Sequence, residues 1–131
     1  MPTIPDSHRD LLNADVAVLG TVGADGRPQL SAVWFIAEGD TISISLNSSR
    51  QKTTNLQANP AATLLILDLQ NPYRYLELRG DAHIERDDDY GFADQVGTKY
   101  NADLREHDGP NDHRVKVELR PERINAVNMR G

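Results

Sequence analysis

The sequence predicts a mostly β fold, an antiparallel β-barrel of six to seven strands with a few helices. Residues 41–47 alternate strictly between apolar and polar side chains, which indicates a strand with one buried face. Short connections rich in glycine and aspartate, such as residues 23–26 and 38–40, join strand-like runs and favour antiparallel neighbours. A barrel is the favoured arrangement because it leaves no long strand edge unpaired. The residues of segment 41–47 expected to point inward are Ile42, Ile44 and Leu46, and those expected to point outward are Thr41, Ser43, Ser45 and Asn47.

The first third of the chain is expected to form a helix followed by a meander of strands. Residues 6–13 are predicted to be a short helix with Asp6 or Ser7 as its N-cap. Strands are predicted at residues 16–22 and 29–37, which are rich in β-branched and other apolar residues. Together with residues 41–47 these strands would follow one another through tight turns.

The rest of the chain is predicted to alternate between helices and strands within one domain that spans residues 1–131. Residues 48–58 are expected to be a helix capped by Ser48 or Ser49 and ended by the Asn59-Pro60 pair. Gly80 lies inside a predicted strand, where glycine is typical of a bend or bulge. The other expected elements are strands at residues 62–69, 73–85, 114–119 and 123–127 and a helix at residues 87–100 that opens with three aspartates.

The composition excludes several classes of function. The 131 residues include no cysteine, so disulfides and thiolate chemistry are absent. The formal net charge of -6 opposes binding to nucleic acid. No apolar run approaches the roughly 20 residues that span a bilayer, and the first residues do not resemble a signal peptide. We therefore expect a cytoplasmic protein that acts on a small molecule, with no nucleic-acid or membrane partner.

One polar segment, residues 47–55, combines two fixed cations with hydroxyl and amide side chains where a strand is expected to meet a helix. A helix N-terminus offers free backbone N–H groups, Arg50 can chelate a phosphate, and Lys52 adds a point charge. If both cations bind one anion, residues 48–52 must be extended or only entering the helix, because helical side chains two apart diverge. The alternative is a solvated helix start with two surface cations. The candidate anion-binding residues are Asn47, Ser48, Ser49, Arg50, Lys52, Thr53 and Asn55.

Other potential sites are weaker. The four histidines show no spacing typical of a metal site, so no metal is expected. The three aspartates at residues 87–89 favour a helix start over a metal site. Trp34 and Phe35 are typical core or interface aromatics, although they could also stack beside a ring cofactor. No residue pattern predicts a catalytic acid, base or nucleophile.

Several blocks of sequence, in their order and spacing, resemble the split β-barrel flavoproteins related to pyridoxamine 5'-phosphate oxidase. They look most like the branch that uses the deazaflavin coenzyme F420, the B-type flavin/deazaflavin oxidoreductases. The blocks are Gly26-Arg27-Pro28-Gln29-Leu30-Ser31, Val33-Trp34-Phe35, Arg50-x-Lys52-Thr53-x-Asn55-Leu56, Asn59-Pro60 and Tyr73-Arg74-Tyr75-Leu76-Glu77-Leu78-Arg79-Gly80.

This resemblance implies a split, FMN-binding-like barrel that forms a homodimer with cofactor sites at the subunit interface. It implies that Arg50 and Lys52 hold the cofactor phosphate, with the other residues of the anion-binding segment nearby. The strand with Ser31, Val33, Trp34 and Phe35 would line the cofactor ring, and Tyr75 of the other subunit would close over it. The implied reaction is hydride transfer between coenzyme F420 and a small electron-poor substrate.

Two alternatives to this function follow from the same resemblance. The first is an FMN-dependent oxidoreductase of the pyridoxamine-phosphate-oxidase type on the same barrel. The second is a non-catalytic protein that binds F420.

Overall fold

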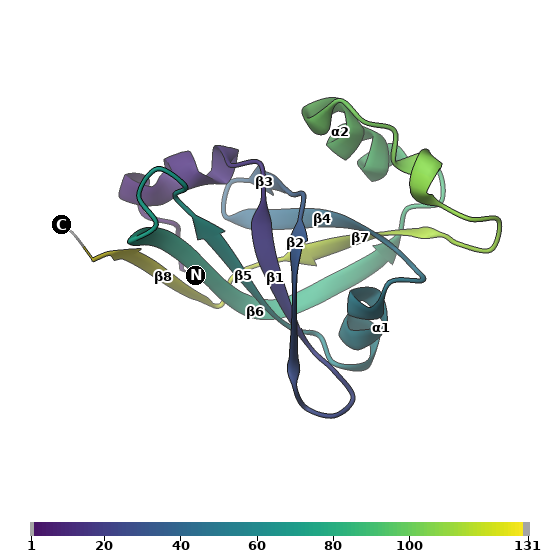
Figure 1. Ribbon diagram of the computed structural model, residues 1–131, viewed down its shortest axis with the longest axis horizontal. Coiled ribbons are helices and arrows are strands. Elements are labelled where there is room, and N and C mark those ends of the chain that lie inside the picture. The colour runs from purple at the N-terminus through teal and green to yellow at the C-terminus, as the bar shows by residue number, and fades with distance from the viewer. Residues whose placement is uncertain (1, 130–131) are drawn as a thin grey trace.

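The computed structural model describes residues 2–129, in which eight antiparallel strands form one curled sheet with short helices around it (Figure 1). This confirms the predicted mostly β fold, with one strand more than expected. The elements are η1 (Asp6–Asn13), β1 (Ala17–Val22), β2 (Pro28–Val33), β3 (Ile36–Glu38), β4 (Thr41–Asn47), α1 (Gln51–Ala58), β5 (Ala61–Leu67), β6 (Arg74–Arg86), α2 (Gly91–Tyr100), η2 (Leu104–His107), β7 (Arg114–Leu119) and β8 (Arg123–Asn128).

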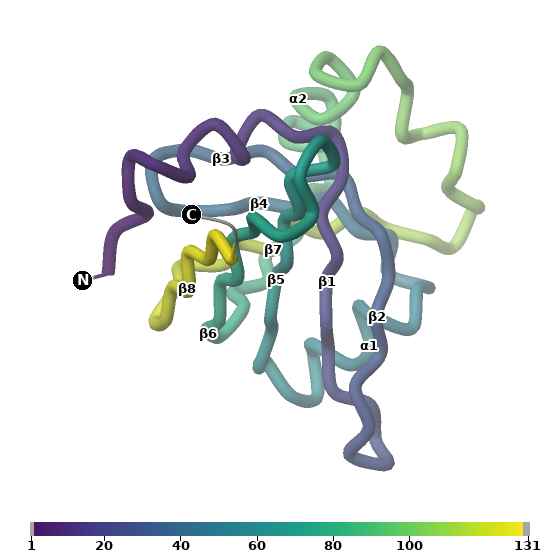
Figure 2. The backbone as a smooth tube through the Cα atoms, turned by 60° about the vertical axis from the view of Figure 1, so that its left-hand side comes forward, coloured from purple at the N-terminus to yellow at the C-terminus, as the bar shows by residue number. Residues whose placement is uncertain are grey.

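The order of strands across the sheet is β2-β1-β5-β6-β7-β4-β3, and β8 pairs with the first half of β6. The long strand β6 holds the barrel together, because it pairs with β5 along its first part and with β7 along its last part. Figure 2 shows the sheet curling so that β1, β2 and β5 stand on one side and β3 and β4 on the other. The two edge strands, β2 and β3, are consecutive in the sequence.

The prediction of one strand over residues 29–37 was wrong, because this segment forms two strands with different partners. Val33, at the end of β2, lies opposite Ala17 of β1, whereas Ile36 of β3 lies opposite Ser43 of β4. The two residues between them carry the chain from one edge of the sheet to the other. The polarity of the segment could not show this break, since side chains alternate in the same way whichever strand is the partner.

The core fills the inside of the curled sheet. Ile42, Ile44 and Leu46 are buried there as predicted. Ser43 and Asn47, expected to face outward into solvent, are also buried, because α2 and the segment after it cover that face of β4. The largest fully buried side chains include Phe35, Leu19, Ile42, Leu56, Leu64, Ile66, Leu76 and Leu78.

The helix starts differ from the predicted ones. η1 is a 3-10 helix whose N-cap is Pro5 rather than Asp6 or Ser7. α1 begins at Gln51, after a turn at residues 48–50, and its N-cap is Arg50 in an extended conformation. No side chain caps either helix. The polar residues before α1 are therefore not used as caps.

Gly80 marks a close approach of two backbones. Its register with Ala62 of β5 is part of an unbroken ladder, so this pair of strands has no bulge there. A Cβ atom at this position would lie 2.8 Å from the backbone oxygen of Arg120, in the connection between β7 and β8. Glycine is thus required where β6 changes partner from β8 to β7.

The three aspartates of residues 87–89 precede α2, which begins at Gly91, so the predicted helix start at residue 87 was wrong. The buried Asp87 carboxylate accepts hydrogen bonds from the backbone N–H groups of Phe92 and Ala93, at 3.0 and 2.8 Å. Phe92, Val96 and Leu104 then form a small apolar cluster between α2, η2 and the sheet. In the described part of the chain, no helix is both long and apolar enough to cross a membrane.

Candidate functional site

The candidate site is a cleft of about 350 Å³ where the ends of β2 and β4 separate. α2 and α1 lie above and below this end of β4 and β7 in Figure 1. The start of α1 and the buried face of α2 and η2 supply opposite walls of the cleft. The lining residues are Ala32, Val33, Trp34, Ser45, Leu46, Asn47, Ser49, Arg50, Lys52, Val96, Leu104, His107 and Arg114.

Lys52 brings a buried positive charge to this cleft. It occupies the second position of α1, and its residue is only 8% exposed. The Lys52 Nζ atom lies 3.2 Å from the Ser31 Oγ atom on β2 and donates a hydrogen bond to it. Burial, and secondarily the neighbouring charge of Arg50, lower the pKa of the Lys52 ammonium group. Keeping this ammonium group charged inside the protein therefore costs free energy, and a bound anion would offset that cost.

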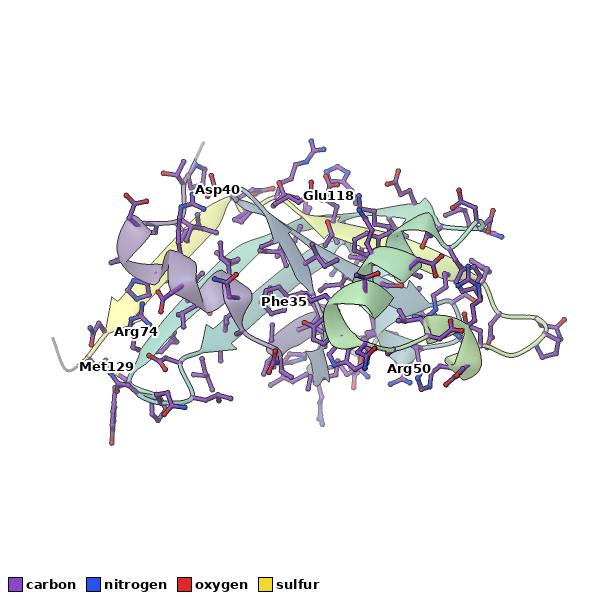
Figure 3. All side chains as sticks on the ribbon, turned by 90° about the horizontal axis from the view of Figure 1, so that it is seen from above. Phe35, Asp40, Arg50, Arg74, Glu118 and Met129 are labelled. Carbon is purple, nitrogen blue, oxygen red and sulfur yellow. The ribbon has the colours of Figure 1, made fainter. Side chains whose placement is uncertain are left out.

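Arg50 lies at the exposed margin of the same cleft. Figure 3 shows it near the segment that follows α2, far from the central Phe35. Because Arg50 is extended and Lys52 is only entering the helix, both side chains can line one cleft, as the two-cation hypothesis requires. Within residues 2–129, neither side chain forms an ion pair with a carboxylate, although the chain carries 20 acidic residues.

Asn47 shapes the turn that presents these cations. Its Oδ1 atom accepts hydrogen bonds from the backbone N–H and the hydroxyl of Ser49, at 2.8 and 2.7 Å. Its Nδ2 atom donates to Asp108 at 2.6 Å and to Asp112 at 3.1 Å. The turn at residues 48–50 is therefore tied to the loop before β7.

A buried ion pair between Asp108 and Arg114 anchors that loop. The Nε and Nη2 atoms of Arg114 lie 2.9–3.1 Å from the carboxylate, and both side chains are almost fully buried. The Tyr90 hydroxyl donates a further hydrogen bond to Asp108. Burial acts to raise the pKa of Asp108, but the hydrogen bonds from Arg114, Tyr90 and Asn47 outweigh burial and hold that pKa below its usual value.

Trp34 provides an aromatic wall at the other end of the cleft. Its indole stacks on Tyr100, with ring centroids 4.4 Å apart and planes 5° from parallel. Phe35 points the opposite way and is fully buried in the core. Of the two aromatics expected beside a ring cofactor, only Trp34 therefore lines the cleft.

The structure brings half of the predicted site residues into the cleft: Val33, Trp34, Asn47, Ser49, Arg50 and Lys52. Ser31 contacts the cleft through Lys52. Three other predicted residues make hydrogen bonds within the barrel instead. Ser48 bonds to the backbone of His113, and the Thr53 hydroxyl donates to the backbone oxygen of Asn47. The Asn55 side chain donates to Thr21 and Gln29. Tyr75 is on the outer face of β6, opposite Leu67 and Val127.

Sequence reasoning missed the wall formed by Val96, Leu104, His107 and Arg114. The first lies on α2, and the others lie in or next to a polar loop whose sequence has no periodicity. The one available signal was His107, an isolated histidine in that loop. In the described part of the chain, no group of three or more histidine or acidic side chains could hold a metal ion.

The barrel and its cleft define a split β-barrel protein of the flavin-binding type. Residues 4–128 match the model of the pyridoxamine 5'-phosphate oxidase family, and the chain belongs to this family of oxidoreductases.

Three solved structures show the same fold. One named F420 reductase is 34% identical, with a TM-score of 0.81, and the match covers 93% of this chain and 98% of that one. A putative pyridoxamine 5'-phosphate oxidase of Listeria innocua is 25% identical, with a TM-score of 0.70 and coverage of 94% and 97%. A conserved hypothetical protein of Mycobacterium tuberculosis is 21% identical, with a TM-score of 0.76 and coverage of 97% and 86%.

Replacing Asp108 by asparagine should destabilise the fold strongly. Arg114 would then remain buried without a counter-charge, which costs about 3–5 kcal/mol of unfolding free energy. Urea denaturation measures this loss. The control Asp88→Asn breaks an exposed pair with Arg86 and should change the unfolding free energy by about 0–1 kcal/mol.

The same carboxylate makes stability depend on pH. The folded protein lowers the pKa of Asp108, so the ionised carboxylate adds to the unfolding free energy. This contribution is complete above the ordinary pKa of 3.8 and is lost as the pH falls through the folded-state pKa. The Asp108→Asn variant should lack this part of the acid dependence. Equal stability of the variant and the wild type would contradict the role of the buried pair.

Proposed function

We propose that this chain is an F420-dependent oxidoreductase that transfers a hydride between the deazaflavin cofactor and a small electron-poor organic substrate. The observation that carries this proposal is the pair Arg50 and Lys52, which face one cleft without carboxylate partners in residues 2–129. Family membership supports the reaction class. The 34% identity to a protein named F420 reductase supports F420 over FMN.

The cleft residues fit a phosphate-bearing cofactor. Arg50 would chelate phosphate oxygens, Lys52 would add a charge-assisted hydrogen bond, and the Ser49 hydroxyl lies on the same turn. The bound anion would supply the counter-charge that Lys52 lacks. The apolar floor near Val33 would exclude water from the ring, and the deazaflavin would supply the hydride chemistry when bound.

We also propose that the protein acts as a homodimer. Val18, Leu30 and Leu65 lie on the outer face of the sheet, where the register places Val18 opposite Leu65 and Gly20 opposite Leu30. Leu30 is 68% exposed, and the strands that carry this face run side by side in Figure 2. An exposed leucine beside two half-buried apolar neighbours on one sheet face favours an interface there. Tyr75 belongs to the same outer face, so it would reach a cofactor only in a partner subunit.

The variant Lys52→Met should weaken binding of F420 without weakening the fold. Methionine keeps the aliphatic length of the side chain but removes the charge. The lost charge-assisted hydrogen bond corresponds to about 1–3 kcal/mol, or roughly 5- to 150-fold in Kd. Because Lys52 is buried without a counter-charge, the unfolding free energy of the free variant should equal or exceed that of the wild type.

Calorimetric titration measures both the affinity and its pH dependence. Anion binding favours the protonated ammonium, so wild-type affinity should fall as the pH rises through the lowered pKa of Lys52, and the variant should lack this dependence. The control Arg123→Met removes one exposed cation on β8 and should change Kd by less than about twofold. Unchanged affinity in Lys52→Met would refute the proposed phosphate site.

A direct competition between cofactors tests the proposed function. We expect the purified protein to be colourless, to quench the fluorescence of added F420, and to oxidise reduced F420 when an electron-poor acceptor is supplied. A yellow preparation that retains FMN would instead identify an FMN-dependent oxidoreductase. Tight F420 binding with no turnover over a panel of acceptors would identify a non-catalytic F420-binding protein.

The substitution Leu30→Glu should dissociate the proposed dimer, because it buries a charge in an apolar interface. Light scattering after size-exclusion chromatography measures the mass of each species. The control Leu69→Glu changes an 82% exposed leucine in the turn after β5, outside the proposed interface, and should leave the mass unchanged. A wild-type protein that is monomeric with F420 bound would overturn the dimer.

A further inference from the structure

We propose that Lys52 is an acylation site, at which a small acyl phosphate transfers its acyl group to the Lys52 amine while Arg50 holds the departing phosphate. This inference goes beyond the proposed function, because it requires the two cations and their cleft but neither F420 nor hydride transfer. The chain has three lysines, Lys52, Lys99 and Lys116. The surroundings of the three amines differ, and those differences single out Lys52.

The Lys52 amine is the one best prepared to act as a nucleophile. It lines the cleft, and among the described residues its one hydrogen bond is to the Ser31 hydroxyl, at 3.2 Å. A hydroxyl holds an ammonium group less strongly than a carboxylate does. Burial, and then the charge of Arg50, lower the pKa of Lys52, so a larger share of the amine is neutral and has a free electron pair.

The other two amines make contacts that depend on their charge. Lys99 Nζ donates to the backbone oxygen of Phe35 at 2.7 Å and lies 4.3 Å from the centre of the Phe35 ring. Lys116 Nζ lies 3.9 Å from the Glu118 carboxylate and 5.1 Å from the centre of the Phe92 ring. Acylation neutralises the nitrogen, so each of these lysines would lose a cation–π contact or an ion pair. The most buried lysine is therefore the one expected to react first.

Arg50 selects the class of acyl donor. It lines the same cleft two positions before Lys52, and its charge acts on the Lys52 amine. A guanidinium group can donate two parallel hydrogen bonds to a phosphate. An acyl phosphate has its reactive carbonyl next to its phosphate, so binding of the phosphate to Arg50 would bring the carbonyl carbon toward the amine.

The transfer balances without a further reactant. The electron pair of the neutral Nζ atom attacks the carbonyl carbon, and a C–N bond forms. The C–O bond to the phosphate breaks, and the phosphate leaves with the electron pair of that bond and takes up the proton that the amine loses. No atom is oxidised or reduced. The resulting amide has no positive charge, so acylation would remove one of the two cations of the anion site and thereby weaken anion binding.

Acetyl phosphate is the probe for this reaction. The full chain, without cofactor, is incubated with acetyl phosphate, and mass spectrometry of its peptides measures the acetylation of each lysine over time. We expect Lys52 to react at least about 3-fold faster than Lys99 or Lys116, and inorganic phosphate to slow Lys52 alone. N-hydroxysuccinimidyl acetate transfers the same acetyl group without a phosphate, and it should favour Lys52 at least about 3-fold less.

A variant then tests the role of Arg50. Arg50→Met should lower the rate of Lys52 acetylation by acetyl phosphate at least about 3-fold, and leave the rate with N-hydroxysuccinimidyl acetate within about twofold. The matched control Arg123→Met removes an exposed cation on β8 and should change neither rate. Thermal unfolding of each variant, followed by circular dichroism, verifies that it folds.

Three results would overturn the proposal. Lys99 or Lys116 could react with acetyl phosphate as fast as Lys52, or Arg50→Met could leave the Lys52 rate unchanged. The two reagents could also favour Lys52 equally, which would show a reactive amine without phosphate recognition. Because no cofactor is added, these outcomes are independent of the F420 titration. Acetyl phosphate could modify Lys52 in a protein that binds no F420, and F420 could bind beside a Lys52 that acetyl phosphate does not modify.

Discussion

The structure depends on the change of sheet edge between Val33 and Ile36. Phe35 anchors this crossing, because its side chain is fully buried and its backbone N–H and C=O both bond to the Tyr100 hydroxyl. The crossing joins the two edge strands, β2 and β3, through the chain itself. It also turns Trp34 outward and lets the ends of β2 and β4 separate, which opens the cleft. The anchoring of Phe35 thus supports both the connection between the edge strands and the site beside it.

The positive charges around the cleft serve two different purposes. Arg114 is neutralised by Asp108 inside the protein, and the resulting network fixes the turn that precedes α1 through Asn47. Arg50 and Lys52 project from that fixed turn without carboxylates of their own among the described residues. A hydrogen-bonded support beneath two cations that form no ion pair is the arrangement expected of a preorganised anion site in a chain whose net charge is -6.

Much of the site was predictable because its cationic part is local in the sequence. Asn47, Ser49, Arg50 and Lys52 lie within six positions of one another, so a single strand-to-helix junction brings them together. The helix caps were wrong, since the serines before α1 bond to remote partners or to Asn47 and do not cap the helix. The opposite wall of the cleft was not predictable, because polar loop residues carry no period that indicates what they face.

The sequence by itself determined the class of fold, the inward-pointing residues of β4 and the cationic junction. Those features follow from alternation and adjacency, which are properties of neighbouring residues. Only the tertiary structure decided that residues 29–37 form two strands, that Tyr100 backs Trp34, and that Asp108 pairs with Arg114. Those outcomes depend on contacts between residues far apart in the chain. Such contacts are selected by the packing of the whole barrel, and local polarity does not record them.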